Sequence, residues 1–204
     1  MAGRSFEKKW WDKGYARVAG VDEAGRGPLA GPVVAAAVCC PADVSFAGVD
    51  DSKRLTEEER EALYEQLTTH PRVEWAVSIQ GREVIDSINI LQATLRAMEG
   101  AVAALPTPPD RALIDGNRMP PACAHNAELL VGGDGKSFAI AAASIIAKVT
   151  RDRMMVQLDA EFPQYGFAQH KGYGVPAHMD AIHRHGPCPA HRHSFQPVKG
   201  MLGK

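Results

Sequence analysis

The apolar positions of this chain begin with two runs separated by a glycine- and proline-rich turn. Residues 18–24 form an apolar run that ends in two acids, and residues 33–40 form a second run of small and β-branched residues. Between them, residues 25–32 have the sequence Gly-Arg-Gly-Pro-Leu-Ala-Gly-Pro. The pattern predicts two buried strands, paired antiparallel, with a sharp turn whose main chain a ligand can approach closely.

Helical and strand patterns continue along the rest of the chain. Thr56-Glu-Glu-Glu59 has the form of a capping box and predicts a helix through about residue 68. The other predicted elements are strands at 73–79 and 111–115, a short apolar run at 129–131, and helices at 89–105, 136–162 and 176–185. The first half of helix 136–162 is almost entirely apolar or small, so we expect this helix to be buried on most sides.

Length and composition limit the classes of protein that this chain can be. With 204 residues and 45% hydrophobic content, we expect one compact domain, or one domain with a small appendage. No apolar stretch is long enough to span a membrane, and residues 1–13 lack the apolar segment of a signal peptide. The four cysteines form no C-x-x-C pair, which favours reduced thiols in the cytoplasm over a disulfide scaffold or a zinc knuckle.

Charge is distributed unevenly although its sum is small. The formal net charge is −1, with an excess of acids over residues 43–86 and an excess of bases over residues 1–17 and 136–204. A basic face of this kind is suited to follow a phosphate backbone, although a simple asymmetry of solvated charges gives the same pattern.

Acidic residues recur at the ends of apolar runs. Asp22 and Glu23 end the first run, and Asp115 and Asp134 each follow a later run next to a glycine. If these strands are neighbours in one sheet, four carboxylates meet near one edge; the alternative is ordinary Asp-Gly turn chemistry. Neighbouring residues on a regular strand point to opposite faces, so Asp22 and Glu23 share a cation only if the strand ends or bends at Glu23.

Four convergent carboxylates without an associated His/Cys set favour Mg²⁺ or Mn²⁺ over zinc. Such ions support phosphoryl transfer on a nucleic acid, which leaves nuclease, polymerase and phosphatase open. We do not expect the C-terminal histidines to bind zinc, because no paired cysteine accompanies them. We interpret Asp152 as a structural partner of Lys148 or Arg151 and not as a fifth ligand.

The segment 163–173 combines aromatic residues, glycine and a base. Tyr173 beside Lys171 and Gly172 is suited to stack on a sugar or base, whereas Tyr165 and Phe167 are better explained as packed loop residues.

The chain resembles the type 2 ribonucleases H, the bacterial ribonuclease HII family. The similar motifs occur in family order and cover about residues 17–200. They are residues 21–33 (Val-Asp-Glu-Ala-Gly-Arg-Gly-Pro-Leu-Ala-Gly-Pro-Val), 51–53 (Asp-Ser-Lys), 113–117 (Leu-Ile-Asp-Gly-Asn), 133–134 (Gly-Asp), 142–149, 170–173 (His-Lys-Gly-Tyr) and 191–198.

This resemblance implies an α/β ribonuclease H-like fold, with a mixed five-stranded sheet flanked by helices and a small helical C-terminal portion at about 163–204 of a single 1–204 catalytic domain. It implies two Mg²⁺ or Mn²⁺ ions and cleavage of RNA–DNA hybrids, and of duplex DNA 5′ to an embedded ribonucleotide, leaving 3′-hydroxyl and 5′-phosphate ends. The residues that match family sites are Asp22, Glu23, Asp115 and Asp134 (metal), Gly25, Arg26 and Gly27 (2′-hydroxyl), Tyr173 (neighbouring deoxyribose), and, with weaker phosphate or supporting roles, Lys53, Asn117 and Lys148.

One position departs from the family pattern. Many relatives have lysine before the Gly-Asp of the fourth acid, where this chain has Gly132, so a phosphate contact near Asp134 is not predicted from that position. We see no sequence for docking a sliding clamp and expect a cytoplasmic monomer whose partner is the nucleic acid duplex. The rival interpretations are a type 1 ribonuclease H, a junction resolvase on the same fold, and a hybrid-binding module without activity.

Overall fold

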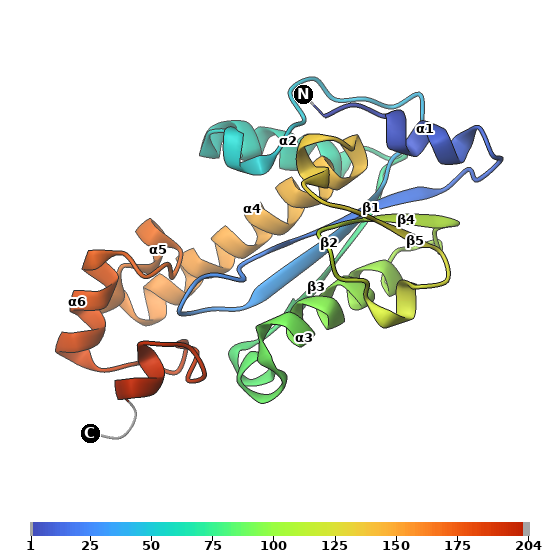
Figure 1. Cartoon of the computed structure of the whole chain (residues 1–204). Helices are drawn as coiled ribbons and strands as arrows, with labels where there is room; N and C mark the ends of the chain where they lie inside the picture. The colour runs from blue at the N-terminus through green and yellow to red at the C-terminus, as the bar shows by residue number, and fades with distance from the viewer. Residues whose placement is uncertain (1, 202–204) are drawn as a thin grey trace.

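A mixed five-stranded sheet forms the centre of the protein (Figure 1). The computed structural model describes residues 2–201. The sheet has the order β3-β2-β1-β4-β5, and its strands are β1 (Val18–Ala24), β2 (Val33–Cys39), β3 (Glu74–Gln80), β4 (Arg111–Asp115) and β5 (Ala127–Leu130). β2 pairs antiparallel with β1 and β3, whereas β4 runs parallel to β1 and β5. The antiparallel pair and the mixed sheet that the sequence predicts are therefore confirmed.

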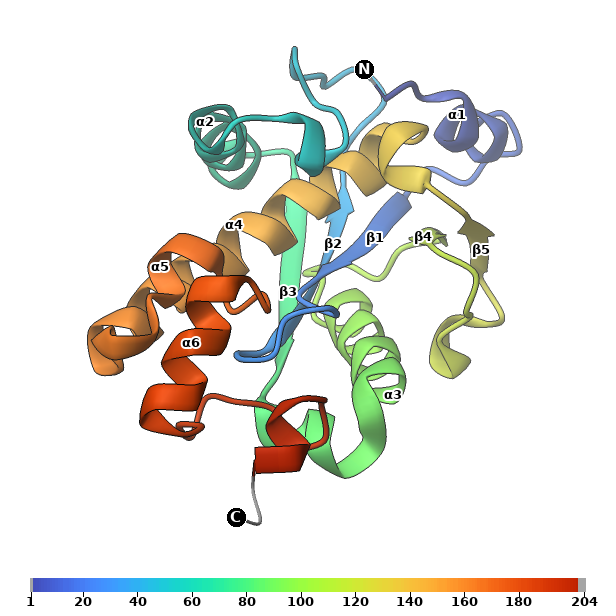
Figure 2. The same ribbon diagram turned by 60° about the vertical axis from the view of Figure 1, so that its left-hand side comes forward.

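Helices cover both faces of the sheet (Figures 1 and 2). α4 (Phe138–Glu161) crosses one face with α2 (Glu57–Thr69) beside it, and α3 (Arg82–Ala103) covers the other. Alternate residues of β2 enter the two cores: Ala36 and Val38 pack towards α4, and Ala35 and Ala37 towards α3. Burial on both faces explains why β2 is a continuous apolar run instead of an alternating one. α1 (Ser5–Trp11) packs its aromatic rings beside Val18, Leu113 and Ile140.

Gly20 lets β1 approach α4 closely. A Cβ at this position would lie 2.0 Å from the carbonyl carbon of Ala139, in the backbone of α4. We expect Gly20→Ala to destabilise the fold by about 3 kcal/mol or more, because neither backbone can retreat without opening a close-packed core. Urea unfolding of the variant measures this loss. Gly135→Ala is the matched control, since a Cβ there meets no atom within 4 Å; equal losses in the two variants would contradict the packing explanation.

The helix on the α3 face begins earlier than the sequence predicts. The predicted start at residue 89 is confirmed for the second of two helical segments, because α3 (Arg82–Ala103) is interrupted at Asn89, where φ is 66°; the segment 82–88 before it was not predicted. The Asn89 side chain accepts a hydrogen bond from the Gln92 N–H at 3.1 Å, so it caps the second helical segment. The amphipathic pattern that starts at Asn89 corresponds to the second helical segment, whose apolar side faces the core. The segment 82–88 was missed although Val84, Ile85 and Ile88 have helical spacing and pack into one apolar cluster.

The C-terminal residues form a small helical layer against one end of α4 (Figure 2). α5 (Phe167–His170), α6 (Pro176–His185) and a 3₁₀ turn at Val198–Met201 gather around Phe167, Met155 and Ile182, all of which are buried. This layer lies against the segment that joins β1 to β2, since the Leu29 N–H donates to the Gly172 carbonyl at 2.8 Å. Within residues 2–201, no helix combines the length and apolar character needed to cross a bilayer.

Candidate active site

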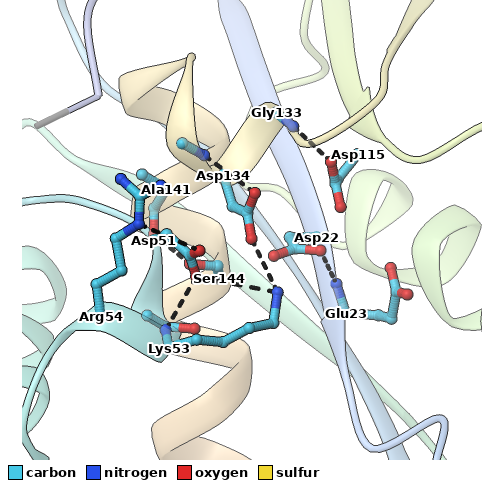
Figure 3. A network of polar contacts seen from close by, with 12 residues as sticks. Asp22, Glu23, Asp51, Lys53, Arg54, Asp115, Gly133, Asp134, Ala141 and Ser144 are labelled. Atoms are coloured by element: carbon cyan, nitrogen blue, oxygen red, sulfur yellow. Dashed lines mark hydrogen bonds and ion pairs between the residues drawn. The ribbon is translucent and has the colours of Figure 1, made fainter.

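Three carboxylates from distant parts of the chain meet at one edge of the sheet (Figure 3). Asp22 lies on β1, Asp115 ends β4, and Asp134 lies in a 3₁₀ turn at Gly133–Gly135 that precedes α4. One oxygen from each carboxylate lies within 4.8 Å of the other two. β1 and β4 are parallel neighbours, with Val21 opposite Ile114, so the residues that follow this pair are brought side by side.

Hydrogen bonds fix the turn that carries Asp134. The Gly133 N–H donates to the Asp115 carboxylate at 2.6 Å, which ties the turn to the end of β4. At the other side, the buried carboxylate of Glu7 accepts from the Ala139 N–H at 2.8 Å and from the Ser137 hydroxyl at 2.6 Å. The predicted strand-to-acid transition is not direct, because β5 ends at Leu130 and Asp134 follows in the 3₁₀ turn.

Glu23 lies beside the three-acid cluster and not within it. β1 continues regularly to Ala24, with Glu23 opposite Ala35 on β2, so the strand does not end or bend at Glu23. The Glu23 carboxylate points away from Asp134 (Figure 3). It forms an ion pair with Arg26 at 3.2 Å. Continued pairing with β2 keeps the alternation of the strand and separates the two neighbouring acids.

The electrostatics of the cluster disfavour three bare negative charges. Burial raises the pKa of Asp22 well above its ordinary value, and the charges of Glu23 and Asp115 raise it further. Burial also raises the pKa of Asp115. The Lys53 ammonium lies 3.0 Å from Asp134 and supplies local positive charge. Such an oxygen-only, anionic donor set fits a hard divalent cation, which would relieve the repulsion that raises these pKa values.

A cleft of about 210 Å³ extends from Asp22 and Glu23 along the β1–β2 connection. Its lining includes most of the substrate-contact residues that the sequence singled out: Gly25, Arg26, Gly27, Lys53, Lys148 and Tyr173. Asn117 lies apart, in a shallow depression over α3 together with Glu23 and Asp115. Asp152 accepts from the Lys148 ammonium at 2.7 Å, so its predicted pairing is confirmed. Tyr165 and Phe167 are buried and stacked, as expected of packed loop residues.

Two arginines in this region have structural contacts that the sequence did not indicate. Arg151 and Arg192 are buried behind the Gly25–Gly27 turn, and their guanidinium groups donate to main-chain carbonyls. The signal available in the sequence was their position: Arg151 in the buried helix, and Arg192 within a family-like motif.

Buried histidines support the backbone of Tyr173. The Tyr173 carbonyl accepts from Nδ1 of His178 at 2.8 Å, which leaves Nε2 of His178 as an acceptor for Nε2 of His191 at 3.1 Å. Nδ1 of His191 then accepts from the Cys188 N–H at 2.9 Å. His170 stacks on His178, and Tyr165 and Phe167 pack around the rings. This order of donors requires both His178 and His191 to be neutral.

We expect acid to destabilise the protein through these two rings. Burial lowers the pKa of His178 and of His191 from 6.5 to about 4, so the unfolded chain binds about two more protons between those pH values. Stability is fully present above pH 6.5 and falls as the pH drops towards 4, by about 2 to 5 kcal/mol in total. Urea unfolding across this range measures the slope. His178→Asn should reduce the slope by about one proton, and an unchanged slope would contradict the assignment.

The fold and the site define a class of protein, a divalent-metal-dependent nuclease built on a ribonuclease H-like sheet. A family model described as Ribonuclease HII matches residues 19–198. The chain belongs to the ribonuclease HII family, whose members are hydrolytic endoribonucleases that act on RNA–DNA hybrids and depend on divalent metal ions.

Individual relatives agree with this assignment. The chain is 50% identical over 200 residues to a ribonuclease HII from Endomicrobium trichonymphae, covering 98% of this chain and 95% of the relative. It is 52% identical over 197 residues to that of Geobacillus kaustophilus, covering 97% of this chain and 75% of the relative. Among solved structures, ribonuclease H2 from Pyrococcus horikoshii OT3 matches with a TM-score of 0.75 at 27% identity, covering 91% of this chain and 96% of that one.

A second solved structure shares the fold and contains a partner. This structure of a PCNA:RNase HII complex from Archaeoglobus fulgidus matches with a TM-score of 0.66 at 26% identity, covering 88% of this chain and 95% of that one.

Proposed function

We propose that this chain cleaves RNA strands of RNA–DNA hybrids, and duplex DNA on the 5′ side of an embedded ribonucleotide, leaving 3′-hydroxyl and 5′-phosphate ends. In the cell it would remove ribonucleotides from DNA and RNA primers from replicated DNA. We expect it to act in the cytoplasm as a monomer with a single domain. The observation that supports a catalytic role most directly is the convergence of Asp22, Asp115 and Asp134 within 4.8 Å.

Asp22, Asp115 and Asp134 would hold Mg²⁺ or Mn²⁺, and Glu23 is the fourth acid of the proposed set. When bound, two such ions activate a water for attack on phosphorus and stabilise the leaving 3′-oxygen. The chain's own contribution is to hold these carboxylates in place: Gly133 orients Asp115, and Lys53 orients Asp134. Because Lys53 and Lys148 line the same cleft, we assign them supporting contacts to phosphate, and Asn117 a similar role at its margin.

Substrate selection is assigned to the Gly25–Gly27 turn and to Tyr173, which line the same cleft as Asp22 and Glu23. The main chain of Gly25, Arg26 and Gly27 would recognise the 2′-hydroxyl, the group that distinguishes RNA from DNA at a single site. The Tyr173 ring is 45% exposed and lies beside Gly27, where it would pack on the neighbouring deoxyribose.

The decisive assay is cleavage of a duplex DNA carrying one ribonucleotide, with Mg²⁺, with Mn²⁺ and with EDTA. We expect a single cut 5′ to the ribonucleotide that requires the ion. A type 1 ribonuclease H would need several consecutive ribonucleotides, a junction resolvase would cut a four-way DNA junction without RNA, and a binding module would cut neither. Any of these three results would overturn the proposal.

A further inference from the structure

Two arginine side chains are buried behind the Gly25–Gly27 turn without a carboxylate partner. Arg151 on α4 is 1% exposed, and Arg192 in the loop after α6 is 0% exposed. Neither guanidinium forms an ion pair within residues 2–201; their N–H groups point instead at main-chain carbonyls. Burying two like charges is costly, and the neighbouring guanidinium adds to burial in lowering the pKa of Arg192 to about 9. Because this burial is costly, we look for the interactions that compensate it.

The two guanidinium groups stabilise the backbone of the segment 25–32, which joins β1 to β2, by donating hydrogen bonds to its carbonyls. Arg192 donates from Nε to the Gly31 carbonyl at 3.0 Å and from Nη1 to the Arg26 carbonyl at 3.1 Å. Its Nη2 donates to the carbonyls of Gly25 and Pro32. Arg151 donates from Nε to the Pro32 carbonyl at 2.9 Å and from Nη2 to the Ala30 carbonyl at 3.0 Å.

A guanidinium group is the side chain best suited to this task. The segment leaves the sheet at Ala24 and returns at Val33, so the carbonyls that these guanidinium groups contact lie outside the β1–β2 ladder, and an unpaired buried carbonyl is costly. Arginine alone presents five N–H donors in a rigid fork and accepts nothing. Gly25 has φ +99°, and a Cβ there would lie 2.2 Å from Nε of Arg151, so the turn and the guanidinium groups occupy closely matched space.

The same arginines connect this turn to the loop that carries Tyr173. Nη1 of Arg151 donates to the Lys171 carbonyl at 3.0 Å, while its other nitrogens hold Ala30 and Pro32. Next to it, the Leu29 N–H donates to the Gly172 carbonyl, and the Arg192 N–H donates to the Leu29 carbonyl, both at 2.8 Å. The two elements assigned to substrate selection therefore share one hydrogen-bonded frame.

We propose that Arg192 is a positioning residue for ribonucleotide recognition: with Arg151, it holds the Gly25–Gly27 main chain in the conformation that meets a 2′-hydroxyl and fixes its distance from Tyr173. The inference rests on the proposed function of that turn. Arg192 lies behind the turn and acts only through it. Its loss therefore affects discrimination of ribose from deoxyribose more than affinity for duplex DNA.

The test is a thermodynamic cycle between Arg192→Lys and removal of the 2′-hydroxyl. The cycle compares a protein that keeps Arg192 with the Arg192→Lys variant, and both carry Asp22→Asn to prevent cleavage. Fluorescence anisotropy gives the Kd of each protein for two duplexes of one sequence, one with a single ribonucleotide and one with none. With Arg192 present, we expect the ribonucleotide to tighten binding by about tenfold, as one well-made hydrogen bond does. In Arg192→Lys, a single ammonium group cannot span the four carbonyls that the guanidinium holds. The preference should therefore fall below about twofold, while the Kd for plain DNA stays within about twofold.

Arg153→Lys is the matched control, since Arg153 lies on α4 but is exposed and paired with Glu61. It should keep the full preference. A folded Arg192→Lys protein with an unchanged preference would overturn the inference. If the protein with Arg192 shows no preference for the ribonucleotide, the failure lies instead in the proposed function.

A measurement on the unmodified chain decides the matter if Arg192→Lys does not fold. A turn that is fixed in advance should protect the amides of Leu29 and Gly31 from hydrogen exchange equally in the free protein and with the duplex bound. Both amides donate to carbonyls of the C-terminal layer, Gly172 and Ala190. Strong protection that appears only after the duplex is added would show that the substrate orders the turn, and the inference would be wrong.

Discussion

Asp22→Asn is expected to lose cleavage by roughly a thousandfold or more, which corresponds to about 4 kcal/mol in the barrier, and to become more stable at the same time. Asp22 is one of the three acids whose carboxylate oxygens lie within 4.8 Å of one another, so its replacement removes a charged ligand from the cluster. Because burial and neighbouring charges raise its pKa, ionised Asp22 destabilises the metal-free fold at neutral pH. A neutral side chain of the same shape relieves that cost, by about 1 to 2 kcal/mol.

Two measurements check this expectation. Initial rates on a duplex with one ribonucleotide give the loss of activity, and urea unfolding in EDTA gives the gain in stability. Asp12→Asn is the control, because Asp12 is an exposed acid paired with Lys8, and its replacement should change neither quantity by much. Near-normal cleavage by Asp22→Asn would remove Asp22 from the catalytic set, and a less stable variant would refute the electrostatic explanation.

Tyr173→Ala is expected to reduce cleavage at a single embedded ribonucleotide much more than cleavage of a continuous RNA–DNA hybrid. Its ring is exposed at the edge of the cleft and lies beside Gly27, the end of the turn assigned to the 2′-hydroxyl. Loss of a stacking ring typically costs about 1 to 3 kcal/mol, so we expect a fall of roughly ten- to a hundredfold in kcat/KM on a single embedded ribonucleotide. A continuous hybrid offers further ribose contacts on either side and should lose only about threefold.

Tyr173→Phe is the matched control for this experiment. The Tyr173 hydroxyl forms no hydrogen bond to any of residues 2–201, so the ring alone should preserve activity on both substrates. Equal losses on the two substrates for Tyr173→Ala would count against a role in recognising the junction. A loss in Tyr173→Phe as large as that in Tyr173→Ala would assign the effect to the hydroxyl instead of the ring.

Some features of the site could not be predicted from the sequence, for reasons that the structure shows. Alternation along β1 correctly indicates that Asp22 and Glu23 point apart, but only the pairing of Glu23 with Ala35 shows that the strand does not bend to reunite them. The sequence places several histidines near Tyr173 without indicating what they contact. Their arrangement as a chain of neutral donors and acceptors depends on α6 and the following loop packing together.

By itself, the sequence determined the local elements and the chemistry available at their ends. Apolar runs predict the paired strands β1 and β2, the capping box predicts the start of α2, and acids after apolar runs identify Asp22, Asp115 and Asp134. These features are local, because strand period, helix caps and turn chemistry depend on neighbours a few residues away.

The tertiary structure alone decided which of these groups meet. Strand order brings Asp22 beside Asp115, the turn before α4 adds Asp134, and the side chain of Arg192 reaches Gly25 across 167 residues of chain. No periodicity encodes such contacts. They arise because buried carbonyls and buried charges must find partners wherever the packed core brings them.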